Sequence, residues 1–475
     1  MARYQYDVAV VGGGSGGLTA ARLAAALGAR TALIEKERLG GDCLHYGCVP
    51  SKALVHVAKV VSLARSSLDL GLMAPDFKVD MARVSAHIQQ VIERVAEGEK
   101  AYVEDVSVRL GQASFRSREE LDLNGDVLLS KHFIIATGSR PRVPQVPGLE
   151  EVGYLTNESI FDLRHLPSSL AVIGGGPVGV EMAQAFARLG SQVTVIQGPT
   201  RLLPKEEPEV SALIAQALAQ DGVRVELGAR MERVSRSDAK KVVQARRGDT
   251  TLTVETDEVL IAVGRTPNVE GLNLEAAGVA YEQTGIKTND YLQTTAPNIY
   301  AIGDVIGGYL FTHVAAYHAG RAVRNALVPV GRKKVDYRVV PWVTFTDPEA
   351  ARVGLTEEEA IRQGQQINVV RFPWHAIDRA QTDGALQGFI KIIHSQKGDK
   401  ILGAHVVGSR AGELLGELAL AMQHNLGLSA IRSTIHAYPT LSLGIQQAAF
   451  EAYLGSKALS NARRLIRSLL SLRGK

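Results

Sequence analysis

The chain has 475 residues, which is too long for one hydrophobic core and predicts about three domains. Its 45% hydrophobic content is ordinary for a globular protein, and its 47 glycines are typical of chains with many tight turns. The formal net charge of +4 is small for this length, so we expect no nucleic-acid binding.

The N-terminal residues run directly into a predicted strand, without the apolar segment and cleavage site of a signal peptide. We expect no apolar run that approaches the roughly 20 residues needed to span a bilayer. The protein is therefore expected to be cytoplasmic. Thiols stay reduced in that compartment, so a close pair of cysteines more often performs chemistry than staples a fold.

The first predicted unit consists of a strand, a glycine-rich turn, a helix and a second strand. Residues 6–11 are almost entirely apolar, as expected for a parallel strand that is buried on both faces. Alanine and leucine predict a helix over residues 18–27, and residues 31–35 form the second strand. This order is that of a nucleotide-binding βαβ unit.

The turn of this unit carries Gly12-x-Gly14-x-x-Gly17, and its second strand ends in Glu35. Glycines at these positions let the backbone approach a pyrophosphate at a helix N-terminus. An acid roughly 20 residues further on can accept hydrogen bonds from a ribose 2′-hydroxyl. The motif therefore predicts a dinucleotide site.

The only two cysteines, Cys43 and Cys48, follow this unit closely. Two cysteines placed at random would rarely lie so near each other. A thiol pair beside a bound dinucleotide predicts electron flow between a cofactor and a disulfide. The alternative is a spare pair of buried cysteines without chemistry.

The nucleotide-binding pattern returns later in the chain. A strand over residues 170–173 leads into Gly174-x-Gly176-x-x-Gly179, and a helix and a strand over residues 192–196 follow. One such motif is a weak signal, whereas two, each between a β-branched strand and an alanine-rich helix, are a strong one. Glycine turns that bind no nucleotide are the alternative.

Other segments repeat as well. The strand that ends in Thr137 and Gly138 returns about 125 residues later as the strand before Gly264 and Arg265. This duplication predicts two nucleotide-binding domains. A further apolar strand ends in Gly303-Asp304, and from about residue 337 the composition changes: strands such as residues 389–393 and a helix over residues 411–423 predict an α+β domain.

Together these motifs resemble the class I pyridine nucleotide-disulfide oxidoreductases, which include dihydrolipoyl dehydrogenase, glutathione reductase and mercuric reductase. The resemblance covers nearly the whole chain, and the block 41–48 most resembles the bacterial mercuric reductase-like branch. Seven segments carry it in a specific order: the first glycine motif with Glu35, residues 43–52, 136–138, the second glycine motif with Glu181, and residues 264–268, 301–304 and 438–440.

The resemblance implies an α/β fold with two Rossmann-like dinucleotide-binding domains, for FAD and NAD(P), and a C-terminal α+β dimerisation domain that forms a homodimer. The limits that we expect are 1–150 and 281–336 for the FAD domain, 151–280 for the NAD(P) domain, 337–454 for the dimerisation domain and 455–475 for a basic tail.

The same resemblance implies the site residues. Cys48 would face the flavin as a thiolate, Cys43 would exchange with the substrate, and Lys52 and Glu181 would pair beside the flavin, where a cation stabilises its reduced form. Asp304 would bind the ribityl chain or hold water near the pyrophosphate. No resident metal is expected. The cofactor-binding residues are Gly12, Gly14, Ser15, Gly16, Gly17, Glu35, Lys36, Gly41, Asp42, Thr137, Gly138, Gly174, Gly176, Val178, Gly179, Gln197, Arg201, Gly264, Arg265, Gly303 and Asp304.

The chain departs from the family near its C-terminus. Thiol-active members carry His-Pro followed by a glutamate that orients the histidine as a base. Here Tyr438 and Leu443 occupy those positions. A tyrosine, with an ordinary pKa near 10, cannot become the cation that a histidine becomes near neutrality. His436 either substitutes or is a plain interface histidine. We therefore expect weak turnover of dihydrolipoamide and glutathione disulfide.

Mercuric reductase also lacks that histidine, but it passes the metal inward through a second cysteine pair. Because this chain has two cysteines in all, dedicated mercury detoxification is doubtful, whereas soft-metal or quinone reduction at the inner pair is compatible with the sequence. In the second nucleotide unit Gln197 stands where NAD enzymes carry an acid, and Arg201 is near in sequence. This favours NADPH over NADH.

The segment 455–475 contains six cations, five leucines that supply apolar surface, and no acid: Lys457, Arg463, Arg464, Arg467, Arg473, Lys475, Leu459, Leu465, Leu469, Leu470 and Leu472. It predicts a basic amphipathic helix that could contact an anionic membrane surface or a protein. The simpler interpretation is a solvated helix packed on the dimer.

Three functions fit the sequence. The first is an FAD- and NAD(P)H-dependent oxidoreductase with a redox-active Cys43–Cys48 disulfide and an unidentified acceptor, either a small molecule or protein disulfide, a metal or a quinone-like compound. The second is a specialised dihydrolipoyl dehydrogenase for a lipoyl protein. The third is a redox-sensing flavoprotein that binds a partner.

Overall fold

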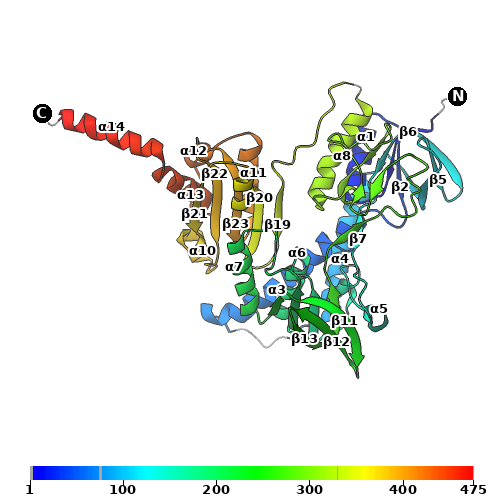
Figure 1. Cartoon of the computed structure of the whole chain (residues 1–475), viewed down its shortest axis with the longest axis horizontal. Coiled ribbons are helices and arrows are strands. Elements are labelled where there is room, and N and C mark those ends of the chain that lie inside the picture. Colours follow the sequence, from blue (N-terminus) through cyan, green and yellow to red (C-terminus); the bar gives the residue numbers. More distant parts are fainter. Residues whose placement is uncertain (1–3, 74–77, 329, 474–475) are drawn as a thin grey trace. The chain divides into compact units, whose positions relative to one another are not determined.

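The computed structural model describes residues 4–73, 78–328 and 330–473. The chain forms two compact units (Figure 1). Unit 1 comprises Met1–Gly198 and Gly228–Asp336, and unit 2 comprises Pro199–Leu227 and Tyr337–Lys475. Lys475, which we counted in the basic tail, lies outside the described residues. The domain limits expected from the sequence stay predictions.

The main sheet of unit 1 is built on the first βαβ unit. Its order is β3-β2-β1-β6-β5-β4, and β18 also pairs with β6. Strands β1, β2, β3, β6 and β18 run parallel, in a register that places Val10 beside Leu33 and Ile134. The strands are β1 (Tyr6–Val11), β2 (Thr31–Glu35), β3 (Ser107–Leu110), β4 (Ala113–Phe115), β5 (Glu120–Leu123), β6 (Asp126–Ile135) and β18 (Ile299–Ala301).

The second nucleotide unit forms another parallel sheet, in which β8 lies between β9 and β14. A three-stranded antiparallel sheet and two antiparallel pairs complete the strands of unit 1. These strands are β8 (Ser169–Ile173), β9 (Gln192–Gln197), β14 (Glu258–Ile261), β11 (Arg230–Ser237), β12 (Lys240–Arg247), β13 (Thr250–Thr256), β7 (Ser139–Pro141), β15 (Arg265–Pro267), β16 (Tyr281–Glu282) and β17 (Gly285–Ile286).

Seven α-helices and three short 3-10 helices are described in unit 1. They are α1 (Ser15–Ala26), α2 (Gly41–His45), α3 (Cys48–Ser66), α4 (Met81–Ala101), α5 (Leu149–Val152), α6 (Pro177–Leu189), α8 (Thr312–Leu327), η1 (Ser67–Leu70), η2 (Ile160–Asp162) and η3 (Gly303–Ile306). Helix α1 begins before the predicted start at residue 18, because Gly16 and Gly17 form its first turn against the glycine loop.

One helical stretch differs from the expectation that no apolar run could span a bilayer. Gly41–Ser66, with a mean hydropathy of 1.2, is long and apolar enough by length and composition alone. A core helix passes the same test, and α3 packs against α4 and α6 within unit 1. A single stretch of this kind, of which 33% of the apolar window is buried, is weak evidence for a membrane span.

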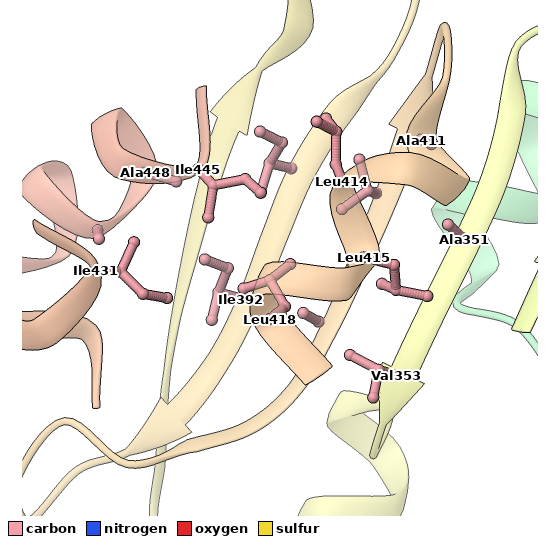
Figure 2. Close-up of a cluster of buried hydrophobic side chains, with 14 of the residues drawn as sticks. Ala351, Val353, Ile392, Ala411, Leu414, Leu415, Leu418, Ile431, Ile445 and Ala448 are labelled. Carbon is pink, nitrogen blue, oxygen red and sulfur yellow. The ribbon is translucent and has the colours of Figure 1, made fainter. Parts of the chain in front are cut away.

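Unit 2 is an antiparallel sheet of order β19-β20-β23-β22-β21 with helices against it. Figure 2 shows part of its core, where Leu414, Leu415 and Leu418 of α11 lie close to side chains of the sheet such as Ile392 and Val353. The elements are β10 (Arg224–Leu227), β19 (Pro341–Thr344), β20 (Glu349–Gly354), β21 (Ile367–Pro373), β22 (Phe389–Ser395), β23 (Ile401–Gly408), α7 (Pro208–Gln220), α9 (Glu357–Arg362), η4 (Trp374–Ala376), α10 (Asp378–Thr382), α11 (Ala411–Gln423), α12 (Leu428–Ser433), α13 (Leu443–Leu454) and α14 (Lys457–Arg473).

A buried ion-pair cluster ties the start of α7 to the rest of unit 2. The Lys391 ammonium, with 5% of its side chain exposed, lies 2.6 Å from Glu357, 2.9 Å from Glu209 and 3.3 Å from Glu207. A buried cation needs such partners, because an unpaired charge in the interior is costly. Residues 199–227 are thereby held to the C-terminal sheet, from which they are distant in sequence.

Candidate functional site

The first glycine turn is held by contacts that only glycine permits. Gly12 has φ +108°, and a Cβ there would lie 2.4 Å from the Ala136 carbonyl oxygen. A Cβ on Gly17 would lie 1.8 Å from the Gly12 carbonyl oxygen. Both contacts are far inside van der Waals distance, so the turn and the start of α1 can pack this way only without side chains.

The N-terminus of α1 is open to an anion. Its N-cap, Gly14, offers no side-chain acceptor, and the first turn of α1 contains no acid. Gly41, at φ +60°, faces Gly14, and a Cβ on Gly41 would lie 2.7 Å from the Gly14 Cα. The helix dipole and the unfilled N–H groups favour a phosphate here, so this cradle fits the pyrophosphate of a dinucleotide.

Glu35 clamps this turn from the end of β2. Its buried carboxylate accepts hydrogen bonds from Gly13 N at 2.7 Å and from Glu37 N at 2.8 Å. The neighbouring predicted residue, Lys36, is exposed and pairs with Glu37 at 3.3 Å. The role of Glu35 as a clamp was not expected from the sequence, which predicted a ribose contact.

The second glycine turn repeats the geometry of the first. Gly174 has φ +116°, and a Cβ there would lie 2.3 Å from the Ala262 carbonyl oxygen; a Cβ on Gly179 would lie 1.9 Å from the Gly174 carbonyl oxygen. Helix α6 again begins without a side-chain cap, and Val178 in its first turn is exposed. Beside Gly176 a Cβ would meet nothing within 4 Å.

Gln197 takes the place that Glu35 has in the first unit. Its Oε1 accepts a hydrogen bond from Gly175 N at 2.7 Å, at the end of β9. The side-chain amide of Gln197 thus holds the second turn in place. Its NH₂ group is a hydrogen-bond donor, whereas a glutamate at this position would present an acceptor. Arg201 belongs to unit 2, where its guanidinium donates to the Pro204 carbonyl oxygen at 2.7 Å.

The two cysteines lie on adjacent helices, Cys43 in the middle of α2 and Cys48 at the first position of α3. Both are free thiols, and Cys43 is hydrogen-bonded to the Cys48 sulfur. The hydroxyl of Thr312, the first residue of α8, lies 3.4 Å from Cys48 Sγ. The two thiols and the Thr312 hydroxyl therefore lie within hydrogen-bonding reach of one another.

These contacts make the two thiols different acids. The hydrogen bond from Cys43, with help from Thr312 and the charge of Lys52, lowers the pKa of Cys48 to about 6 against the effect of burial. The same hydrogen bond and burial raise the pKa of Cys43. At neutral pH the pair is a Cys48 thiolate beside a Cys43 thiol, and only the thiolate is a strong electron donor.

Lys52 and Glu181 form the predicted ion pair. Lys52 follows Cys48 by one turn of α3, and its Nζ lies 2.7 Å from Glu181 Oε2 on α6. The Glu181 side chain is 4% exposed, so it needs this partner. The pair therefore joins the helix of the cysteines to the helix that begins at the second glycine turn.

A hydrogen-bond network connects Asp304 with the cysteine block. Ser139 Oγ donates to Asp304 at 2.6 Å and accepts from Arg265 Nε at 2.7 Å. Arg265 also lies 2.9 Å from Asp42, which accepts a hydrogen bond from Asn157 at 3.1 Å. Burial raises the pKa of Asp304. The guanidinium of Arg265, a predicted cofactor contact, is thus engaged by the protein itself.

The duplicated segments that carry these residues pair with each other. Strand β7 runs antiparallel to β15, so Ser139 of the first copy lies opposite Pro267 of the second. Thr137 donates to the Asn268 carbonyl oxygen at 2.7 Å. Gly138, Gly264 and Gly303 all have positive φ, which permits the sharp turns after their strands.

Sequence reasoning missed Ser139, Asn157 and Thr312. Ser139 directly follows Thr137-Gly138 and could have been included in that motif. Asn157 and Thr312 have no local signal, because their partners are far away in the chain.

Tyr438 and His436 lie in unit 2. Tyr438 is exposed, and a hydrogen bond to Asp378 raises its pKa. His436 Nε2 lies 2.9 Å from Glu417 and its Nδ1 lies 3.0 Å from the Thr434 carbonyl oxygen. Both ring nitrogens of His436 are thus engaged by groups of unit 2.

Comparisons with known proteins agree with this geometry. The family model described as pyridine nucleotide-disulphide oxidoreductase matches residues 6–319, and its dimerisation-domain model matches residues 340–449. Mercuric reductase of Bacillus cereus is 39% identical over 94% of this chain and 71% of its own length. Dihydrolipoyl dehydrogenase of Chlorobaculum tepidum is 37% identical over 94% and 97%. The Cu(II) complex of the HOCl-induced flavoprotein disulfide reductase RclA from Escherichia coli has a TM-score of 0.84 and 31% identity, over 94% of this chain and 98% of that one.

Proposed function

The chain belongs to the pyridine nucleotide-disulphide oxidoreductase family, and from this membership we propose that its Cys43–Cys48 pair delivers electrons to a soft-metal ion such as Cu(II). The family membership makes it a flavoprotein disulfide oxidoreductase that binds FAD and a pyridine nucleotide and carries a dimerisation domain. FAD, when bound, takes a hydride from the nicotinamide and passes the electron pair to the disulfide.

The observation that carries the proposal is an asymmetric thiol pair in a chain without the family's His/Glu base. Reduction of a disulfide substrate needs a proton for each leaving thiolate, which the missing histidine would supply in its protonated form. A metal ion needs none. The Cys48 thiolate and Cys43 thiol become a disulfide, release one proton and two electrons, and reduce two Cu(II) to two Cu(I).

Two findings support this assignment. Tyr438 and Leu443 replace the base and its carboxylate, and His436 is engaged by Glu417 and Thr434. A flavoprotein disulfide reductase at 31% identity has been solved as a Cu(II) complex. The second candidate, dihydrolipoyl dehydrogenase activity, is favoured by the 37% identity to such an enzyme, and lipoamide is therefore the comparison substrate.

The test is anaerobic reoxidation of the NADPH-reduced protein in a stopped-flow instrument. We expect Cu(II) to discharge the reduced enzyme much faster than lipoamide, glutathione disulfide or a soluble quinone. The Cys43→Ser variant should lose this reaction, because the exchange thiol is gone. Lipoamide turnover faster than that with Cu(II) would instead identify a dihydrolipoyl dehydrogenase. If none of these acceptors reoxidised the reduced enzyme, the redox-sensor function would be favoured.

We also propose that NADPH is the preferred reductant. The amide of Gln197 puts no negative charge near the expected adenosine ribose, so a 2′-phosphate meets no repulsion there. The Gln197→Glu variant should keep the clamp on Gly175 and shift the ratio of kcat/KM for NADPH and NADH by at least about tenfold toward NADH. A parent protein with a strong NADH preference would refute the assignment.

A further inference from the structure

Helix α14 (Lys457–Arg473) lies outside everything that the redox chemistry uses. The dimerisation-domain match ends at residue 449, before α14 begins. In Figure 1 the helix continues from α13 and extends away from the sheet of unit 2. Its apolar side chains face solvent: Leu465 is 62%, Ile466 53%, Leu469 52% and Leu470 61% exposed. So much exposed aliphatic surface on one helix indicates a binding face.

The apolar and basic residues of α14 occupy opposite faces. At 3.6 residues per turn, the apolar residues fall within an arc of about 140°. These residues are Leu459, Ala462, Leu465, Ile466, Leu469 and Leu470. The rest of the circumference carries Lys457, Arg463, Arg464 and Arg467, together with Ser460, Ser468 and Ser471. The side chains of Leu472 and Arg473 lie outside the described residues.

The charge of α14 selects among the partners that could cover this face. The last acidic residue of the sequence is Glu451, so the helix carries cations that no acid of its own balances. Pairing with α14 of a second copy through the apolar faces would leave the arginines on the outer faces without acidic partners. An anionic phospholipid surface can instead bind both faces of the helix, because its headgroups attract the arginines and its acyl boundary accommodates the leucines.

We propose that α14 is a membrane-surface anchor that lies in the plane of an anionic phospholipid bilayer, with Leu465, Ile466 and Leu469 buried below the headgroups. A helix with a row of cations along one face cannot enter the bilayer core, whereas its apolar face can sink to the acyl boundary while the cations stay among the headgroups. The redox units would thereby be held at the bilayer surface.

Co-sedimentation of the full-length protein with vesicles tests this. Vesicles of equal parts phosphatidylglycerol and phosphatidylcholine should bind the protein, in a manner weakened by salt, whereas pure phosphatidylcholine vesicles should bind it far less. The Arg463→Glu/Arg464→Glu/Arg467→Glu variant should bind the anionic vesicles at least about 100-fold more weakly, since each lost cation alone costs about fivefold.

Two matched variants separate anchoring from folding. The first variant, Arg463→Lys/Arg464→Lys/Arg467→Lys, keeps the charge and should bind the anionic vesicles as the parent does. The second, Leu465→Ser/Leu469→Ser, also keeps the charge but should lose most of the vesicle binding. Unchanged circular dichroism and flavin absorbance would show that the rest of the chain is intact. Equal binding of the parent to both vesicle types would overturn the proposal. So would absence of vesicle binding combined with loss of the dimer in the leucine variant, which would show that a second copy covers this face.

Discussion

Cys43 and Cys48 are close in sequence, yet their surroundings give the two thiols opposite acidities. The Cys48 sulfur receives hydrogen bonds from Cys43 and from Thr312 and lies near the charge of Lys52. The anion of Cys43 is disfavoured by its hydrogen bond to the Cys48 sulfur and by burial, which outweigh its own hydrogen bond from Thr312. This difference decides which thiol holds the negative charge of the reduced pair and which one remains available for exchange with an acceptor.

Replacement of Thr312 tests the origin of the lowered pKa. Because the pKa of Cys48 is lowered to about 6, its thiolate should persist at neutral pH and disappear as the pH falls through that value. Thr312→Val removes one hydrogen bond to the charged sulfur and should raise this pKa by about one unit. The pH dependence of the long-wavelength thiolate–flavin absorbance measures it. Thr312→Ser keeps the hydroxyl, so the pKa of Cys48 in this variant should match that of the parent. An unchanged Cys48 pKa in Thr312→Val would show that Thr312 does not lower it.

At the scale of elements, the two glycine turns have the same construction. Each requires a glycine in the first turn of the helix that follows it. Gly17→Ala would place a Cβ 1.8 Å from the Gly12 carbonyl oxygen, so α1 must move and FAD should be lost on purification. Gly179→Ala has the same clash in the second turn and should retain FAD but raise KM for the nicotinamide cofactor.

Gly98→Ala is the matched control for these variants. Gly98 is exposed within α4, and a Cβ there would meet nothing within 4 Å. This change should keep the flavin and stabilise the protein by up to about 1 kcal/mol, because alanine is the better helix former. The ratio of flavin to protein absorbance is measured for all three variants, the melting temperature checks Gly98→Ala, and steady-state kinetics with the nicotinamide cofactor check Gly179→Ala. A Gly17→Ala protein that purifies with full flavin content would contradict the assignment of the first turn.

The elements that could be predicted from sequence are those with strong local patterns. The apolar strands around both glycine motifs and the α+β character of the C-terminal region are confirmed. The sheet β11-β12-β13 was missed, because its outer strands are exposed at most positions and lack a clean apolar alternation. The pairing of Thr312 with Cys48 and of Glu417 with His436 depends on the folded chain and leaves no pattern in the sequence.

At the scale of the whole molecule, we infer the class of enzyme from similarity over nearly the whole chain, whereas we infer the acceptor from only a few positions. Mercuric reductase and dihydrolipoyl dehydrogenase relatives both match 94% of the chain, so cofactor use and the disulfide centre follow from the whole fold. In our proposal the acceptor depends on a few positions, among them Tyr438, Leu443 and His436. Similarity over the whole chain therefore establishes the chemistry of the centre without selecting the substrate.

We propose that Cys48 is the thiolate that faces the flavin and that Cys43 is the thiol that meets the acceptor. The most direct test is the visible spectrum of the oxidised-flavin Cys43→Ser and Cys48→Ser proteins at neutral pH. We predict long-wavelength thiolate–flavin charge-transfer absorbance in Cys43→Ser, which retains the Cys48 thiolate, and none in Cys48→Ser. The reverse pattern, or absence of the band in both flavin-loaded proteins, would contradict the account.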